Sequence, residues 1–82
     1  MRIGERIKYL REAKGLTQKD VANKLGLESA AVSKYELNLR EPNIEALKKL
    51  SEIFEVSTDF LLGLTPDVYI GEKDKETFNL TK

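Results

Sequence analysis

The chain has 82 residues, carries 14 basic and 14 acidic side chains, and contains neither cysteine nor histidine. A chain of this length forms one small domain with a modest core. Without cysteine there is no disulfide framework or thiolate metal site, and without histidine the commonest general base and metal ligand is missing, so we expect no enzyme, no cofactor and no metal site.

The first predicted element is a helix over residues 2–14. Ile3, Ile7 and Leu10 lie four and three positions apart, which is the spacing of an apolar stripe on one face of a helix. Gly15 marks its end.

The next two predicted helices are short and are joined by a tight turn. Thr17 is a good N-cap for the first of them, with Asp20 as its acidic capping-box partner, and Gly26 ends that helix. The other runs from about residue 29 to residue 37. Its inward-facing side chains are Val32 and Tyr35, and its outward-facing ones are Ser29, Ala30, Ser33 and Lys34. Small and polar residues along one helix face are typical of a helix-turn-helix motif.

A loop and two more helices follow. Asn38 suits the left-handed residue that ends a helix, and Pro42 cannot continue one. Asn43 can cap a fourth helix, and Ser57 can cap a short fifth helix. The expected core-facing residues of the fourth helix are Ile44, Leu47, Leu50 and Phe54. In the fifth helix Phe60, Leu61 and Leu62 supply apolar bulk. The predicted fold is therefore all-α, a compact five-helix bundle with a helix-turn-helix.

Residues 66–82 form a C-terminal extension to the predicted domain at 1–65. Two short β-prone runs, 68–70 and 77–80, lie on either side of a charged segment. An isolated hairpin is marginal in water, so an ordered extension needs the bundle or a partner to pack on. The sequence leaves two alternatives open, a frayed tail and a dimerisation segment.

Charge is distributed unevenly along the chain. Residues 1–40 carry nine Lys or Arg and five Asp or Glu, whereas residues 41–82 carry five and nine. A basic half that holds the outward helix face is the asymmetry expected of a small DNA-binding protein. The alternative is that these charges form ordinary solvated helix faces.

Several short motifs follow one another at defined spacings over about residues 2–65. They are Arg11, Lys14-Gly15-Leu16-Thr17-Gln18, Ala22, Leu25-Gly26, Val32-Ser33-Lys34-Tyr35-Glu36, Pro42 and Leu61-Leu62-Gly63. In these motifs the chain resembles the lambda-type phage repressor and Xre-like family of helix-turn-helix DNA-binding domains. The resemblance implies a lambda-repressor-like fold whose third helix enters the major groove of DNA.

The resemblance also assigns DNA contacts. The residues at family positions that reach base edges are Ser29, Ala30, Ser33 and Lys34. Of these, Lys34 can donate to guanine and Ala30 can only touch a thymine methyl group. Gln18 resembles a glutamine that binds a phosphate and braces the reading helix. The expected phosphate contacts are Thr17, Gln18, Lys19, Asn38, Arg40 and Asn43, with Arg2 as a weaker candidate.

Arg11 and Glu36 match a largely buried structural ion pair of the family. The sequence also departs from the family at three places. Glu28 stands where Ser or Thr usually caps the third helix, and Ala30-Ala31 replaces more polar residues, so we expect weaker affinity and specificity for DNA. Asn38 replaces the common glycine, which is harmless because asparagine tolerates left-handed geometry.

The sequence thus predicts a sequence-specific DNA-binding transcriptional regulator, a repressor bound as a homodimer to a two-fold operator on double-stranded DNA. The alternative is a protein-interaction module of the same fold, which binds a regulatory protein such as a toxin or an anti-repressor and binds DNA weakly. With no apolar run near 18 residues and no signal-peptide pattern, we expect a cytoplasmic protein with no membrane contact.

Overall fold

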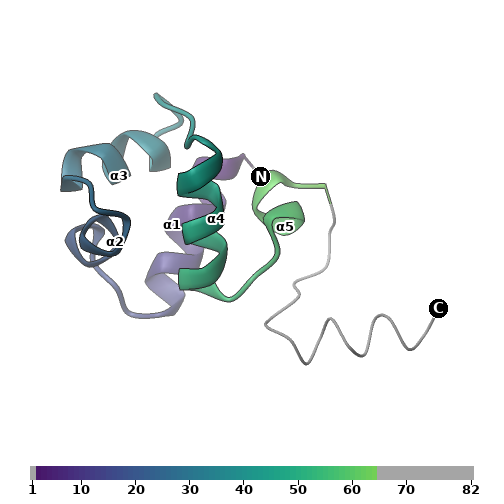
Figure 1. The fold of residues 1–82 in the computed structure, drawn as a ribbon, viewed down its shortest axis with the longest axis horizontal. Coiled ribbons are helices and arrows are strands. Elements are labelled where there is room, and N and C mark those ends of the chain that lie inside the picture. The colour runs from purple at the N-terminus through teal and green to yellow at the C-terminus, as the bar shows by residue number, and fades with distance from the viewer. Residues whose placement is uncertain (1, 65–82) are drawn as a thin grey trace.

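The computed structural model describes residues 2–64, which form five helices and no strand (Figure 1). The predicted all-α fold is therefore confirmed for this part of the chain. The predicted extension at 66–82 lies outside the described residues. The helices are α1 (Ile3–Ala13), α2 (Gln18–Leu25), α3 (Ser29–Glu36), α4 (Ile44–Phe54) and α5 (Thr58–Leu62).

The helices begin where local capping chemistry allows. The Thr17 hydroxyl accepts from the Asp20 N–H at 3.0 Å, and the Asp20 carboxylate accepts from the Thr17 N–H at 2.9 Å, so the predicted capping box starts α2. Asn43 Oδ1 accepts from the Ala46 N–H at 2.8 Å, and Ser57 Oγ from the Phe60 N–H at 3.0 Å. Each bond satisfies an N–H group that has no partner within its helix.

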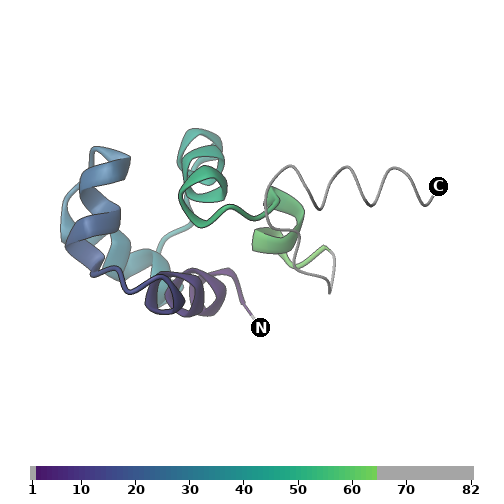
Figure 2. The same ribbon diagram turned by 90° about the horizontal axis from the view of Figure 1, so that it is seen from below.

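The helices are arranged with α2 and α3 at one end of the molecule, α1 and α4 in the middle, and α5 at the other end (Figures 1 and 2). Their apolar faces meet in one buried cluster. Its members are Ile7, Leu10, Val21, Ala22, Leu25, Val32, Tyr35, Leu50, Phe54, Val56 and Leu61. Val32 and Tyr35 face inward as predicted, which leaves the opposite face of α3 outside the core. None of the helices in residues 2–64 is long and apolar enough to cross a bilayer.

The predicted core face of α4 is wrong at its first residue. Ile44 is 77% exposed, whereas Ala46, Leu50 and Phe54 are buried and Leu47 is half-buried. Residues in an α-helix are separated by about 100°, so Ile44 lies about 200° around the axis from Ala46. In α5, Leu61 is fully buried, whereas Leu62 is 47% exposed.

Candidate nucleic-acid interface

The turn between α2 and α3 is set by the backbone. Gly26 has a φ of 71°, and the Leu27 N–H donates to the Ala22 carbonyl at 2.9 Å. This left-handed ending turns the chain sharply so that α3 begins three residues later. Glu28 takes the N-cap position of α3 without any side-chain capping bond, as its departure from Ser or Thr predicts. Fully buried Val21 and Val32 pack in the core beneath the two helices.

The outer face of α3 presents the four residues predicted to reach base edges. Ser29, Ala30 and Lys34 are exposed, and Ser33 is half-buried. An eight-residue helix is about 12 Å long, and its diameter suits the major groove of B-DNA. The structure therefore places these four side chains on one accessible surface, and their base contacts stay a prediction.

The C-terminal end of α3 is held by a hydrogen-bonded ion pair. Arg11 Nε lies 2.6 Å from Glu36 Oε2, and Arg11 Nη2 lies 3.2 Å from Glu36 Oε1. Arg11 also donates to the Leu16 carbonyl at 2.8 Å. The side chains of Arg11 and Glu36 are only 12% and 3% exposed. The bond to Glu36 raises the pKa of Arg11, so this guanidinium stays charged.

Gln18 extends this ion pair into a three-residue network. Its Nε2 donates to Glu36 Oε1 at 3.0 Å, so the first residue of α2 contacts the last residue of α3. A glutamine amide carries two N–H bonds, and therefore one phosphate contact is compatible with the bond to Glu36. The network ties α1, α2 and α3 together at the end of the reading helix.

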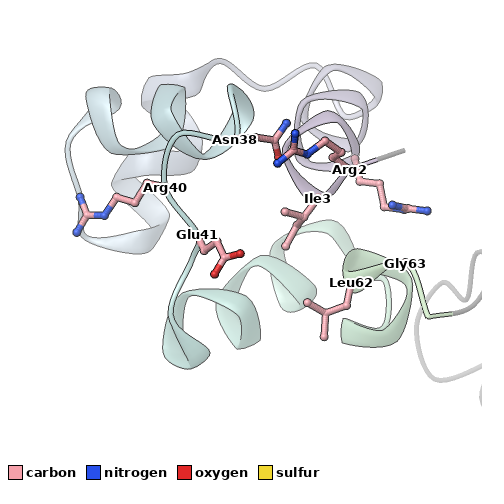
Figure 3. A pocket seen from close by; sticks show the side chains of 8 residues that line it. Arg2, Ile3, Asn38, Arg40, Glu41, Leu62 and Gly63 are labelled. Carbon is pink, nitrogen blue, oxygen red and sulfur yellow. The ribbon is translucent and has the colours of Figure 1, made fainter.

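The other predicted phosphate contacts divide into two groups. Lys19 and Arg40 are exposed, and in Figure 3 Arg40 extends away from the other labelled side chains. Thr17 and Asn43 use their side-chain oxygens as helix caps. The asparagine N–H groups are left as donors toward a phosphate, whereas the threonine O–H also interacts with the Asp20 carboxylate. Asn38 likewise uses its Oδ1, which accepts from the Gly4 N–H at 3.0 Å, and its N–H groups remain donors.

Gly4 is a residue that sequence reasoning missed. It is buried, and a Cβ atom there would lie 2.6 Å from the Glu36 carbonyl oxygen and 2.7 Å from Asn38 Oδ1. No real side chain tolerates such distances, so α1 and α3 approach this closely only because residue 4 is glycine. A glycine inside a helical pattern often marks a packing contact, and that was the available signal.

Comparisons with known proteins agree with this geometry. Residues 7–61 match the family model described as helix-turn-helix. The transcriptional regulator ImmR of Bacillus subtilis (strain 168) is 44% identical over 63 residues, which make up 77% of this chain and 50% of ImmR. The chain thus spans about half the length of that relative.

Two solved structures are similar over most of the described residues. The crystal structure of the P22 c2 repressor in complex with synthetic operator 9T has a TM-score of 0.73 and 34% identity, covering 76% of this chain and 94% of that chain. The SinR protein/SinI protein complex has a TM-score of 0.68 and 33% identity, covering 98% of this chain and 79% of that chain. These matches confirm the repressor-like fold, and the chain belongs to the Xre-like helix-turn-helix family.

Proposed function

We propose that the chain is a sequence-specific DNA-binding transcriptional regulator that acts as a repressor in the cytoplasm. The observation that carries the proposal is the placement of α3, whose end is fixed by Arg11, Gln18 and Glu36 while Ser29, Ala30 and Lys34 lie exposed on its outer face. A reading helix needs this combination, because base contacts gain specificity only when the helix is held rigidly. The similar P22 c2 repressor chain is bound to an operator.

In this proposal α3 inserts into the major groove. Lys34 donates to a guanine, the two serines donate or accept at neighbouring bases, and Ala30 contacts a thymine methyl group. The phosphate contacts that fix the register come from Thr17, Gln18, Lys19, Arg40 and Asn43. Because the face offers few strong donors, part of the specificity comes from DNA shape.

We further propose that two copies bind a two-fold operator. A hollow of about 510 Å³ lies between the start of α1, the α3–α4 loop and α5, and Leu62 at its edge is 47% exposed (Figure 3). Arg40 and Glu41 line the same hollow. In a two-fold contact the same patch of each copy meets the other, so exposed Leu62 is the residue proposed to lie at the contact. Leu62→Glu is expected to shift the chain toward monomer in sedimentation equilibrium.

A regulatory protein partner fits the same proposal. The SinR protein/SinI protein complex contains a chain whose similarity covers 98% of the present chain. Such a partner lowers DNA affinity if it binds the DNA-free form more tightly. In the alternative, a protein-interaction module with weak DNA binding, DNA affinity is low and does not depend on Lys34.

The test is selection of bound sequences from a pool of randomised duplex DNA at near-physiological salt. An enriched palindrome supports a dimeric reader, and an enriched single half-site supports a monomeric one. Lys34→Ala is expected to relax preference at one base pair by about 1–3 kcal/mol. Lys48→Ala removes an exposed lysine from α4 instead and should leave the preference unchanged. No enrichment by a folded chain would reject sequence-specific reading.

A further inference from the structure

The side chain of Asn38 is turned onto the start of α1. Its Oδ1 accepts from the Gly4 N–H at 3.0 Å, although the two residues are 34 positions apart. Gly4 lies in the first turn of α1, where N–H groups have no carbonyl partner within the helix. Asn38 therefore caps α1 from outside that helix, at the point where the chain leaves α3.

The backbone at Asn38 is held in the conformation that makes this contact. Asn38 has a φ of 61°, its N–H donates to the Tyr35 carbonyl at 3.0 Å, and the Leu39 N–H donates to the Lys34 carbonyl at 2.9 Å. Glycine is the residue that most readily adopts this helix ending, and it is common here in the family that the sequence resembles. A glycine has no side chain, so it would close the helix but leave the Gly4 N–H without this acceptor.

The contact lies where two helix ends meet at close range. A Cβ at Gly4 would come within 2.6 Å of the Glu36 carbonyl oxygen, so the first turn of α1 lies directly against the last turn of α3. The N-terminus of a helix carries partial positive charge and the C-terminus partial negative charge, so the two ends attract. Asn38 adds one directional bond to that attraction and thereby fixes where the end of α3 lies along α1.

We propose that Asn38 is a positioning residue of the DNA-binding surface. The bond to Gly4 fixes where the end of α3 lies against the first turn of α1, and therefore the direction in which the outer face of α3 points. Figure 3 shows Asn38 beside the start of α1, near Arg2. This inference rests on the proposed DNA-binding function, and it gives this chain a latch that a glycine at position 38 cannot provide.

The test compares Asn38→Gly with wild type on the operator recovered by selection and on an unrelated duplex. Asn38→Gly is expected to weaken operator binding by up to about tenfold, because binding must then restore the placement of α3 that the lost hydrogen bond held, while binding to the unrelated duplex changes less than about twofold. The slope of log affinity against log salt should stay unchanged, because no phosphate contact is lost. Hydrogen exchange of the Gly4 amide should quicken.

Two variants serve as controls. Glu55→Gly makes the same backbone change at the other left-handed residue that is not glycine in residues 2–64, at the end of α4, and should leave the operator preference unchanged. Asn38→Asp keeps an accepting oxygen toward Gly4. It should keep the slow exchange of the Gly4 amide and the operator preference, while its added charge weakens binding to both duplexes alike.

Two outcomes would overturn the inference. If Asn38→Gly reduces the slope of log affinity against log salt by about one and weakens binding to both duplexes equally, the side chain binds a phosphate. If the Gly4 exchange rate and the operator preference both stay at wild-type values, the latch has no role. Failure of the proposed function is distinguishable, because wild type itself would then show no salt-dependent DNA binding, and the Gly4 exchange rate still reports the latch without DNA.

Discussion

Arg11 and Glu36 are 25 positions apart, yet their side chains meet in a two-pronged ion pair with distances of 2.6 and 3.2 Å. Both groups are largely buried, so each depends on the other for the hydrogen bonds that water would otherwise provide. The pair joins the last turn of α1 to the end of α3. It is therefore first a structural element, and under the proposed function it affects DNA binding by holding α3.

Arg11→Ala is expected to lower the free energy of unfolding by about 3–5 kcal/mol, because it leaves the Glu36 carboxylate buried without its cation. Arg11→Lys keeps the charge but loses the two-pronged geometry, so its loss should be smaller. Urea unfolding of the full chain measures both. Lys8→Ala, at an exposed position of the same helix, should change stability by no more than about 0.5 kcal/mol. An Arg11→Ala protein as stable as wild type would contradict the prediction.

Gly4→Ala should destabilise the chain even though alanine favours helices more than glycine does. The added methyl group meets the Glu36 carbonyl and Asn38 Oδ1, and overpacking of this kind costs about 1–3 kcal/mol. Higher helix propensity offsets about 1 kcal/mol of that cost. The melting temperature in thermal unfolding measures the net effect of overpacking and helix propensity. A rise in melting temperature would mean that α1 can move away from α3 at little cost.

Glu28→Gln and Glu28→Ser separate two effects at the start of α3. Glu28 makes no side-chain capping bond, and its carboxylate lies near the proposed phosphate surface. Either substitution removes a negative charge there, so both should strengthen DNA binding. Serine is also a good N-cap, so Glu28→Ser alone should raise stability, by about 1 kcal/mol. Unchanged or weaker DNA binding by both variants would show that residue 28 lies away from the DNA.

Stability at low pH should depend on Asp20. The backbone N–H and then the hydroxyl of Thr17 lower the pKa of Asp20 in the folded chain. A carboxyl group whose folded pKa lies below its unfolded value stabilises the fold above that unfolded value, and this contribution is lost as the pH falls through the folded pKa. NMR titration of the carboxyl carbon should show the lowered midpoint. Asp20→Asn should remove this part of the acid dependence, and a normal midpoint would exclude the capping box in solution.

Local features of the fold were predictable because their chemistry is contained in a few neighbouring residues. The caps at Thr17, Asn43 and Ser57 each need only an oxygen three residues before an N–H group. The inward side of α4 was harder, since Ile44 and Ala46 both begin plausible apolar stripes and only the packing of the other helices selects one.

The candidate site divides in the same way. The outward face of α3 follows from helical periodicity once Val32 and Tyr35 are placed in the core. The bond from Gly4 to Asn38 joins residues 34 positions apart, and it depends on the angle between α1 and α3, which no local pattern encodes. The sequence therefore predicted a phosphate contact at Asn38 but not the bond of its oxygen to Gly4.

The bonds that fix α3 in the described part of the chain lie at its end, through Glu36 and the Asn38 latch, and not on its outer face. Under the proposed function, substitutions at Ser29, Ala30, Ser33 and Lys34 alter what the helix reads without disturbing the bonds that hold it. This separation would make the domain evolvable. New operators could then be acquired through a few changes at these four positions, and one scaffold could yield regulators with different targets.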